Sequence, residues 1–447
     1  MTRIWIGYTT RYRDGGPELA RAAQTLAETL RAREGAAAVR CIAIESKAAF
    51  LDEMQRVVEA GGTLDELHFF GHSGMYGPMF GTTALPEQFS PHEWRSLSAL
   101  QSAQHPRGLK LPLGPASQAF FHACRTARWF APFFARTFGL TAWGYHWYTT
   151  FTLRPDRFVW PGLGRPEAPL YLVGCRGRKS DGPLGSARKY AGLMPTEPMK
   201  RFEPAEIGEA ASYDGVAERY DAVFEDIRVR RDEWRWLNAH LDGSAAPRVL
   251  DIGCGNGALL RALEQRIGSG VGVDASAGML AMARRRTEGS SKLKFVQVDG
   301  PTLPFADGSF DVVTSLLSFR YLDWDPLMAE IRRVLAPGGR LLIVDMVASP
   351  VGLREAPRLG LDAARALAER ARNRPFREAL KRLTADPQWQ EMIRYNPIRA
   401  QHEFVWYLES RFPGQKVEVL NVGWQSRVLA FDSGPLAPGQ VAPQTYP

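Results

Sequence analysis

A glycine-rich turn follows a short apolar run in the second half of the chain, within the sequence VLDIGCGNG that starts at Val249. The run predicts a buried strand, and helix-like residues follow the turn directly. A nucleotide-like ligand must come within van der Waals distance of such a turn, and Cβ atoms at Gly253, Gly255 and Gly257 would block it. We therefore predict that these three glycines line a ligand of that kind.

Two further strand-like runs end in acidic residues. The first ends at Asp274, about 20 residues after the turn, where a carboxylate can accept hydrogen bonds from both hydroxyls of a ribose. The second ends at Asp299 and Gly300, which can receive an adenine amino group. The turn alone also fits a dinucleotide site, with Ala258 in place of a third glycine, but Asp251 and these two companions favour a different cofactor.

In this order and spacing, the motifs resemble the class I S-adenosylmethionine-dependent methyltransferases, and within them the branch that includes ubiquinone and menaquinone biosynthesis enzymes. The resemblance implies a Rossmann-like fold of seven strands and S-adenosylmethionine as the cofactor. It assigns the ribose contact to Asp274 and the adenine contact to Asp299. The cofactor-binding residues that it implies are Tyr213, Tyr220, Asp251, Gly253, Gly255, Gly257, Asp274, Asp299, Gly300 and Ser315.

The methyl acceptor is constrained by two segments. Residues 315–321 (SLLSFRY) lack the polar, proline-rich, aromatic signature of enzymes that methylate the exocyclic amines of bases, which counts against a base as acceptor. The helix-rich residues 354–411 lie where the family places a lid, and their aromatic side chains suit a planar small molecule or simply form the core of a helical cap. Arg320 and His402 could orient or deprotonate an acceptor hydroxyl, or serve only as structural hydrogen-bonding groups.

Two apolar runs in the first half of the chain end in reactive side chains. LHFFGHSG carries His72, and SQAFFHACRTA carries Cys124. Because sites in open α/β sheets form at the carboxyl ends of strands, the two would meet at one sheet edge, where Arg125 favours a thiolate. The alternative is that Cys124 is a small buried apolar residue. We assign the nearby His68 and His122 to packing.

The stretches GHSG and ACRT around these two residues resemble the caspase-like peptidases, which include metacaspases and CHAT-type domains. The resemblance covers roughly residues 1 to 175 and implies an αβα sandwich. It makes Cys124 the nucleophile and His72 the general base. Ser73 departs from the pattern, since many relatives have glycine directly after the histidine.

The elements that must position these residues form two series. Strand-like and helix-like patterns alternate as βαβαβ from the start of the chain, and a second such series begins near residue 212. We predict an α/β protein of two domains: a caspase-like domain over 1–180, a linker over 181–208 that is rich in Gly, Pro, Ser and Lys, and a methyltransferase domain over 209–447 with a helical lid at 354–411.

Composition narrows the class of protein further. In 447 residues, 45% hydrophobic and 23% charged, no apolar run reaches the length of a membrane span, and the first residues do not resemble a secretory signal. We expect a soluble, cytoplasmic protein. The four cysteines lie far apart, so we expect neither a metal site nor disulfides. The net charge of +8 is spread as arginine over many helices, so we expect no nucleic-acid partner.

Two main hypotheses for function follow. In the first, the protein is a methyltransferase that acts on a small-molecule or peptide acceptor and is fused to a caspase-like domain. In the second, it is a cysteine peptidase with a His72/Cys124 dyad, regulated by a methyltransferase-like domain that senses the cofactor. A third hypothesis, a scaffold with two degenerate sites, is disfavoured by the intact Asp251, Asp274 and Asp299.

Overall fold

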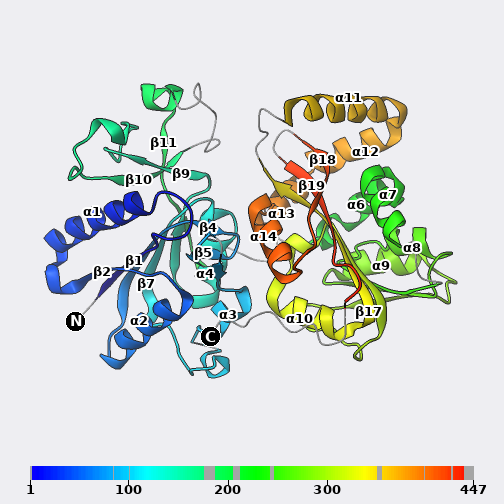
Figure 1. Ribbon diagram of the computed structural model, residues 1–447, viewed down its shortest axis with the longest axis horizontal. Helices are drawn as coiled ribbons and strands as arrows, with labels where there is room; N and C mark the ends of the chain where they lie inside the picture. Colours follow the sequence, from blue (N-terminus) through cyan, green and yellow to red (C-terminus); the bar gives the residue numbers. More distant parts are fainter. Residues whose placement is uncertain are drawn as a thin grey trace. The chain divides into compact units, whose positions relative to one another are not determined.

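The structure is a computed structural model that describes residues 3–83, 85–99, 101–175, 187–204, 212–241, 246–349, 355–396, 398–423 and 426–436. The chain divides into two compact units, Met1–Gly208 and Glu209–Tyr446, each of which is described by itself (Figure 1). The domain boundary expected near residue 208 lies outside the described residues. Among these residues, no helix is long and apolar enough to cross a lipid bilayer.

The N-terminal unit is built on a six-stranded sheet with strand order β12-β8-β7-β3-β1-β2. All neighbours in this sheet pair in parallel except the edge strand β12, which runs antiparallel to β8. The strands are β1 (Ile4–Tyr8), β2 (Val39–Ala43), β3 (Leu64–Phe70), β7 (Leu113–His122), β8 (Thr141–Gly144) and β12 (Lys200–Phe202).

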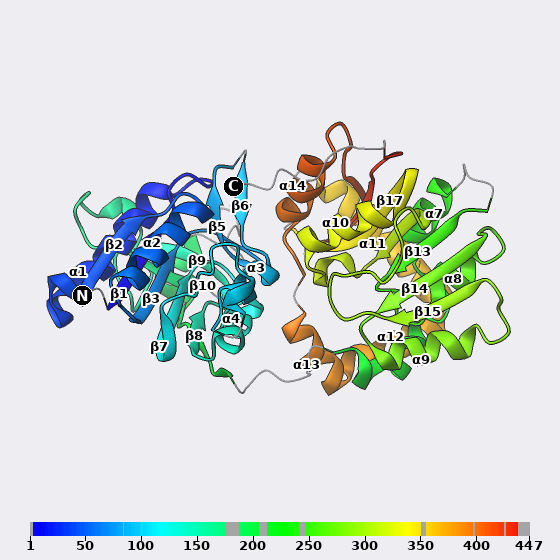
Figure 2. The same cartoon turned by 90° about the horizontal axis from the view of Figure 1, so that it is seen from below.

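Helices cover both faces of this sheet. Helix α1 (Gly16–Glu34) packs on one face, while α2 (Lys47–Glu59), α3 (Pro91–Ser96) and α4 (Phe130–Phe138) bury aromatic and aliphatic side chains on the other (Figure 2). Short 3-10 and π turns complete the chain path at η1 (Ala36–Ala38), η2 (Ser102–Gln104), η3 (Thr126–Arg128), η4 (Pro161–Leu163) and η5 (Lys189–Leu193).

Two small antiparallel sheets were not expected. One contains β4 (Ser73–Gly74), β5 (Gly77–Gly81) and β6 (Pro86–Gln88), and the other β9 (Tyr148–Thr152), β10 (Tyr171–Cys175) and β11 (Thr196–Glu197). The last predicted strand of this half therefore leaves the parallel sheet. Part of the segment predicted as a linker is also structured, because β11 pairs with β10 in the small sheet and β12 pairs with β8 in the six-stranded sheet. Residues 181–186 and 205–208 lie outside the described residues.

The C-terminal unit has a seven-stranded sheet with strand order β15-β14-β13-β16-β17-β19-β18, which confirms the Rossmann-like prediction. Only β19 runs antiparallel to its neighbours. The strands are β13 (Arg248–Ile252), β14 (Ser269–Asp274), β15 (Leu293–Gln297), β16 (Phe310–Leu316), β17 (Leu335–Ala348), β18 (Glu418–Val422) and β19 (Ser426–Asp432).

Helices also cover both faces of the second sheet. Helices α10 (Trp324–Val334) and α14 (Gln401–Arg411) pack on one face, and α7 (Arg231–His240), α8 (Ala258–Leu263) and α9 (Ala277–Arg286) on the other. Helix α6 (Ala217–Phe224) and the turns η8 (Asp214–Val216), η9 (Ile227–Val229) and η10 (Phe319–Tyr321) connect these elements.

The helical segment predicted at 354–411 consists of α11 (Ala356–Arg372), α12 (Arg374–Ala385), α13 (Pro387–Tyr395) and α14, between β17 and β18. Its members have different environments. In α14, Phe404 and Tyr407 are fully buried in the core against the sheet, so these two aromatics belong to packing. Helix α12 instead packs on α6, where Leu383 meets Val223 and Phe224.

Candidate functional site

The glycine turn after β13 is held open by its backbone conformation. Gly253, Gly255 and Gly257 have φ angles of 72°, 53° and 71°, a left-handed region that glycine adopts readily. The N–H groups of Gly253 and Cys254 both donate to the carbonyl of Val273, which fixes the turn against β14. A Cβ at Gly253 would meet the Ser318 side chain at 2.3 Å, whereas one at Gly255 would enter open space. The open side of the turn therefore lies at Gly255.

Asp274 joins this turn to the end of β14. Its two carboxylate oxygens accept the N–H groups of Gly255 and Ser276, each at 2.9 Å. Burial raises the pKa of Asp274, and these two backbone donors oppose the rise. Asp299 and Gly300 lie exposed after β15, at the same carboxyl edge of the sheet. The edge thus presents two carboxylates beside an open backbone turn, as a ribose and a base require.

Asp251 lies one layer deeper, 2% exposed, and accepts a hydrogen bond from the Thr314 hydroxyl at 2.9 Å. Burial raises the pKa of Asp251 to about 7, and the neighbouring Asp274 adds to the rise. Its charge at neutral pH is therefore costly unless a cation lies close by.

This burial predicts a pH-dependent difference in stability between Asp251→Asn and the parent protein. In the unfolded chain the Asp251 carboxyl has a pKa of about 4. Between pH 5 and 7 the folded protein therefore binds more protons than the unfolded chain, and the free energy of unfolding falls as pH rises. An asparagine at position 251 does not titrate, so the variant does not lose stability in this way, and its amide oxygen can still accept the hydrogen bond from Thr314. The free energy of unfolding of the variant, relative to the parent, should rise by about 1.4 kcal/mol per pH unit over this range. Denaturant titrations at several pH values measure it, and a pH-independent difference would contradict the burial argument.

The segment before β13, which contains α6, is hydrogen-bonded to the glycine turn. The Asn256 amide donates to Asp221 and to the carbonyl of Phe224, each at 3.0 Å, which attaches α6 to the glycine turn. Tyr213 and Tyr220 lie in the same segment, and their rings contact Trp389 of α13. The two predicted tyrosines are thus brought together, and α13 supplies a third aromatic ring.

Ser315 is placed differently from the other predicted contacts. It is 1% exposed, and its hydroxyl donates to the carbonyl of Ile252 at 3.1 Å and lies 2.8 Å from the Ser318 hydroxyl. Ser318 donates to the same carbonyl at 2.7 Å. Both serines thus support the end of β13 from beneath the turn.

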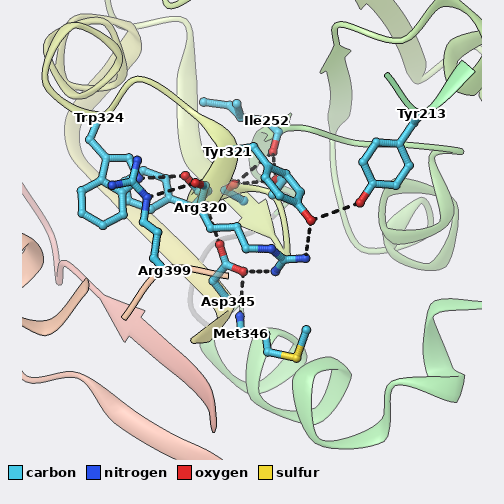
Figure 3. A network of polar contacts seen from close by, with 11 residues as sticks. Tyr213, Ile252, Arg320, Tyr321, Trp324, Asp345, Met346 and Arg399 are labelled. Atoms are coloured by element: carbon cyan, nitrogen blue, oxygen red, sulfur yellow. Dashed lines mark hydrogen bonds and ion pairs between the residues drawn. The ribbon is translucent and has the colours of Figure 1, made fainter. Parts of the chain in front are cut away.

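A network of hydroxyl groups and charges extends from Tyr213 into the core (Figure 3). The Tyr213 and Tyr321 hydroxyls lie 3.2 Å apart, and Arg320 donates to the Tyr321 hydroxyl at 2.9 Å. Arg320 also forms an ion pair with Asp345, which is fully buried. From the other side, Arg399 donates to the carbonyl of Arg320 at 3.0 Å.

Arg320 can only donate, so the Tyr321 hydroxyl accepts from it. Between the two tyrosine hydroxyls either oxygen can be the donor; when Tyr321 donates, the Tyr213 proton is left for a ligand. Burial and the neighbouring Tyr321 raise the pKa of Tyr213, so it stays a neutral donor. Burial lowers the pKa of Arg320, but Asp345, Tyr321 and Tyr213 together outweigh burial and raise the pKa, so the guanidinium stays charged. Arg320 can be recognised as a candidate from the sequence, whereas Tyr321, Asn256 and Asp345 cannot, because their contacts join residues far apart in the chain and leave no local pattern.

In the N-terminal unit, β3 and β7 are neighbours, and His72 and Cys124 follow their carboxyl ends. The Ser73 hydroxyl donates to the carbonyl of Cys124, which holds the two segments together. The Cys124 sulfur accepts the N–H of Thr149 at 3.3 Å and lies 3.2 Å from its hydroxyl. His72 donates from Nε2 to the carbonyl of Asp14 at 2.9 Å, so its Nδ1 keeps the lone pair.

Comparison with known proteins gives matches in the C-terminal unit. A family model described as a methyltransferase domain matches residues 250–343. Demethylmenaquinone methyltransferase of Thermus thermophilus is 37% identical over 146 residues, which cover 31% of this chain and 66% of that protein. Methyltransferase GfsG of Streptomyces halstedii is 37% identical over 144 residues, covering 31% and 48%.

A solved structure of an S-adenosylmethionine dependent methyltransferase from Mesorhizobium loti shares 29% identity, covers 26% of this chain and 54% of its own, and has a TM-score of 0.25. The chain thus spans about half to two thirds of the length of the relatives it matches. The residues 250–343 that match the family model contain the glycine turn, Asp274 and Arg320, and end two residues before Asp345. The C-terminal unit carries a class I S-adenosylmethionine-dependent methyltransferase domain, with S-adenosylmethionine as its cofactor.

Proposed function

We propose that the protein methylates a small planar acceptor that presents an oxygen atom, of the quinol or phenol class. The carrying observation is the network of hydrogen bonds and charges that ends at the Tyr213 hydroxyl and includes Tyr321, Arg320 and Asp345. An acceptor that binds as its oxyanion, after its hydroxyl proton has passed to solvent, would be held and oriented by the Tyr213 hydroxyl as donor before it takes the methyl group. The names of the relatives, which include demethylmenaquinone methyltransferases, agree with this class of acceptor.

The residues fit the cofactor at the glycine turn. Gly255 has open space where a Cβ would stand, Asp274 and Asp299 can receive ribose and adenine, and the buried Asp251 carboxylate suits the cationic methionine part. When bound, S-adenosylmethionine supplies a methyl group already activated on a sulfonium. The chain then has to align the acceptor and exclude water, and the aromatic rings of Tyr213, Tyr220 and Trp389 serve this purpose.

A screen with S-adenosylmethionine that carries a labelled methyl group tests the proposal. We expect transfer to naphthoquinols and substituted phenols, and none to peptides or nucleosides. Tyr213→Phe should lower kcat with these acceptors while S-adenosylmethionine binding stays within about twofold, because only the donor to the acceptor is removed. Transfer to peptides alone, or an unchanged kcat in Tyr213→Phe, would contradict it.

Gly253→Ala should mainly lower the stability of the fold, whereas Gly255→Ala should mainly lower the affinity for S-adenosylmethionine. Both place a side chain at positive φ, which costs of order 1–3 kcal/mol. At Gly253 the new Cβ also clashes with Ser318, so the free energy of unfolding should fall further than in Gly255→Ala. At Gly255 it projects into free space beside Asp274, so we expect a folded protein that has lost at least about tenfold in S-adenosylmethionine affinity. Thermal melts and calorimetry measure both, and equal effects at the two positions would argue against this geometry.

We propose as a second activity that the N-terminal unit is a caspase-like cysteine peptidase. Three contacts support it: Ser73 joins the His72 and Cys124 segments, Thr149 donates to the sulfur, and the carbonyl of Asp14 fixes the proton of His72 on Nε2. A thiolate is stabilised by such a backbone donor, and a neutral imidazole can take the thiol proton. The fusion would then join peptide cleavage and methyl transfer in one chain.

Cys124→Ala should leave methyl transfer unchanged and abolish cleavage in a peptide library.

Alkylation by iodoacetamide at pH 7, mapped by mass spectrometry, should be fastest at Cys124 and should slow at least about tenfold in His72→Ala. Cys41 is the internal control, because burial raises its pKa to about 11 and it should react slowly in both proteins. Equal rates at Cys124 and Cys41 would remove the basis for a peptidase.

A further inference from the structure

Three side chains on β3 and β7 are hydrogen-bonded in series inside the N-terminal unit. His68 Nε2 lies 2.9 Å from a carboxylate oxygen of Glu66, and His68 Nδ1 lies 3.1 Å from Nε2 of His122. In the sheet, His68 pairs with Phe120, and Phe70 pairs with His122, so both histidines project from the same face. From sequence alone both histidines are assigned to packing, but the strand register brings them into one series of hydrogen bonds.

The Glu66 carboxylate sets the position of every proton in this chain. It can only accept, so His68 carries its proton on Nε2 and accepts at Nδ1. His122 therefore donates from Nε2, and the lone pair of its Nδ1 remains. Arg33 donates to the other Glu66 oxygen at 3.2 Å, and the bond to His68 lowers the pKa of Glu66. Burial lowers the pKa of both histidines, so they stay neutral at pH 7.

His122 forms part of the wall of a cavity of about 360 Å³. Its other walls come from α1, β10 and β11 and include Leu26, Phe70, Leu172 and Glu197. This volume lies within the range of small-molecule sites, about 300–1,000 Å³. In the part of the chain that the structure describes, the only hydrogen bond of the His122 ring is the one to His68. The wall of the cavity is thus mainly apolar, and its polar side chains include the His122 imidazole, the Glu197 carboxylate and the hydroxyls of Thr29, Tyr145 and Thr196.

We propose that this cavity binds a small amine with an apolar body, whose N–H groups donate to Nδ1 of His122 and to the Glu197 carboxylate. A neutral imidazole that presents a lone pair repels an anion, and Glu197 adds negative charge, so carboxylates and phosphates are excluded. A hydrocarbon would fill the cavity but leave the lone pair unpaired. An alcohol supplies only one N–H or O–H donor, whereas an ammonium group supplies three, so only the amine can donate to both His122 and Glu197.

Four probes of one shape test the proposal on the full-length protein: 2-phenylethylamine, 2-phenylethanol, ethylbenzene and phenylacetate. By saturation-transfer NMR and calorimetry, we expect 2-phenylethylamine to bind best and phenylacetate not to bind. His122→Phe should weaken the amine at least about tenfold and leave ethylbenzene unchanged, because it removes only the acceptor. His105→Phe, in a loop outside the cavity, is the matched control.

Leu26→Trp fills the cavity with both histidines intact, so it should abolish binding of all probes, and it decides the matter if His122→Phe fails to fold. A second readout needs no ligand: ¹⁵N spectra of histidine-labelled protein should show an unprotonated Nδ1 at His122, and Glu66→Ala should mix the tautomers. Failure of the amine to bind, equal amine affinity in His122→Phe or Leu26→Trp, or a protonated Nδ1 would each overturn the proposal.

Discussion

Asp274→Ala should weaken S-adenosylmethionine binding about a hundredfold. Its carboxylate lies at the carboxyl end of β14, beside the glycine turn, and can accept hydrogen bonds from two ribose hydroxyls. Hydrogen bonds to a charged group contribute about 1.5–3 kcal/mol each, so the loss of this acceptor costs about 3 kcal/mol or more. The variant also frees the N–H groups of Gly255 and Ser276, which loosens the turn itself. Isothermal calorimetry with the full chain measures the change.

Asp311→Ala is the matched control for this experiment. Asp311 also accepts a backbone N–H, that of Arg248 at 2.8 Å, but it does so at the opposite end of β13. Its loss should leave S-adenosylmethionine affinity within about twofold, since the cofactor binds at the carboxyl edge of the sheet. If both variants lost affinity equally, the effect would come from the sheet as a whole and the assignment of Asp274 would fail.

The C-terminal unit could be predicted closely because each of its motifs is local. The strand-like run predicted to end at Asp274 ends at that residue in the structure, since buried parallel strands give short apolar runs that stop at a polar residue. The glycine turn is equally local, and its positive φ angles follow from the residue type.

Two kinds of feature could not be predicted from the sequence: strands too short to show an alternating pattern, and side-chain pairs whose members are far apart in the chain. The strands β11 and β12 contain two and three residues in a Gly- and Pro-rich stretch, too few to show alternation. The His68–His122 bond joins residues 54 apart, and the Arg320–Asp345 pair joins residues 25 apart. Such pairs depend on strand register, which a sequence pattern alone does not specify.

Arg320→Leu should destabilise the C-terminal unit by about 3–5 kcal/mol, because it leaves the carboxylate of Asp345 buried without its cation. Asp345 is 0% and Arg320 6% exposed, so water cannot replace the lost partner. The backbone N–H groups of Arg320 and Met346 still donate to Asp345 and offset part of the cost. Denaturant unfolding followed by tryptophan fluorescence measures the change, since Trp324 packs beside Phe319 and Tyr407 in the same core.

Two further variants separate burial of charge from loss of packing. Arg248→Leu removes the cation of a half-exposed pair with Asp311 and should cost less than about 1 kcal/mol. The double variant Arg320→Leu/Asp345→Asn removes both charges and keeps an oxygen for the two backbone donors, so it should recover at least half of the stability lost in Arg320→Leu. Its kcat should stay as low as that of Tyr213→Phe, because the Tyr321 hydroxyl beside Tyr213 has lost its Arg320 donor. Recovery of stability together with activity would show that this ion pair serves the fold alone.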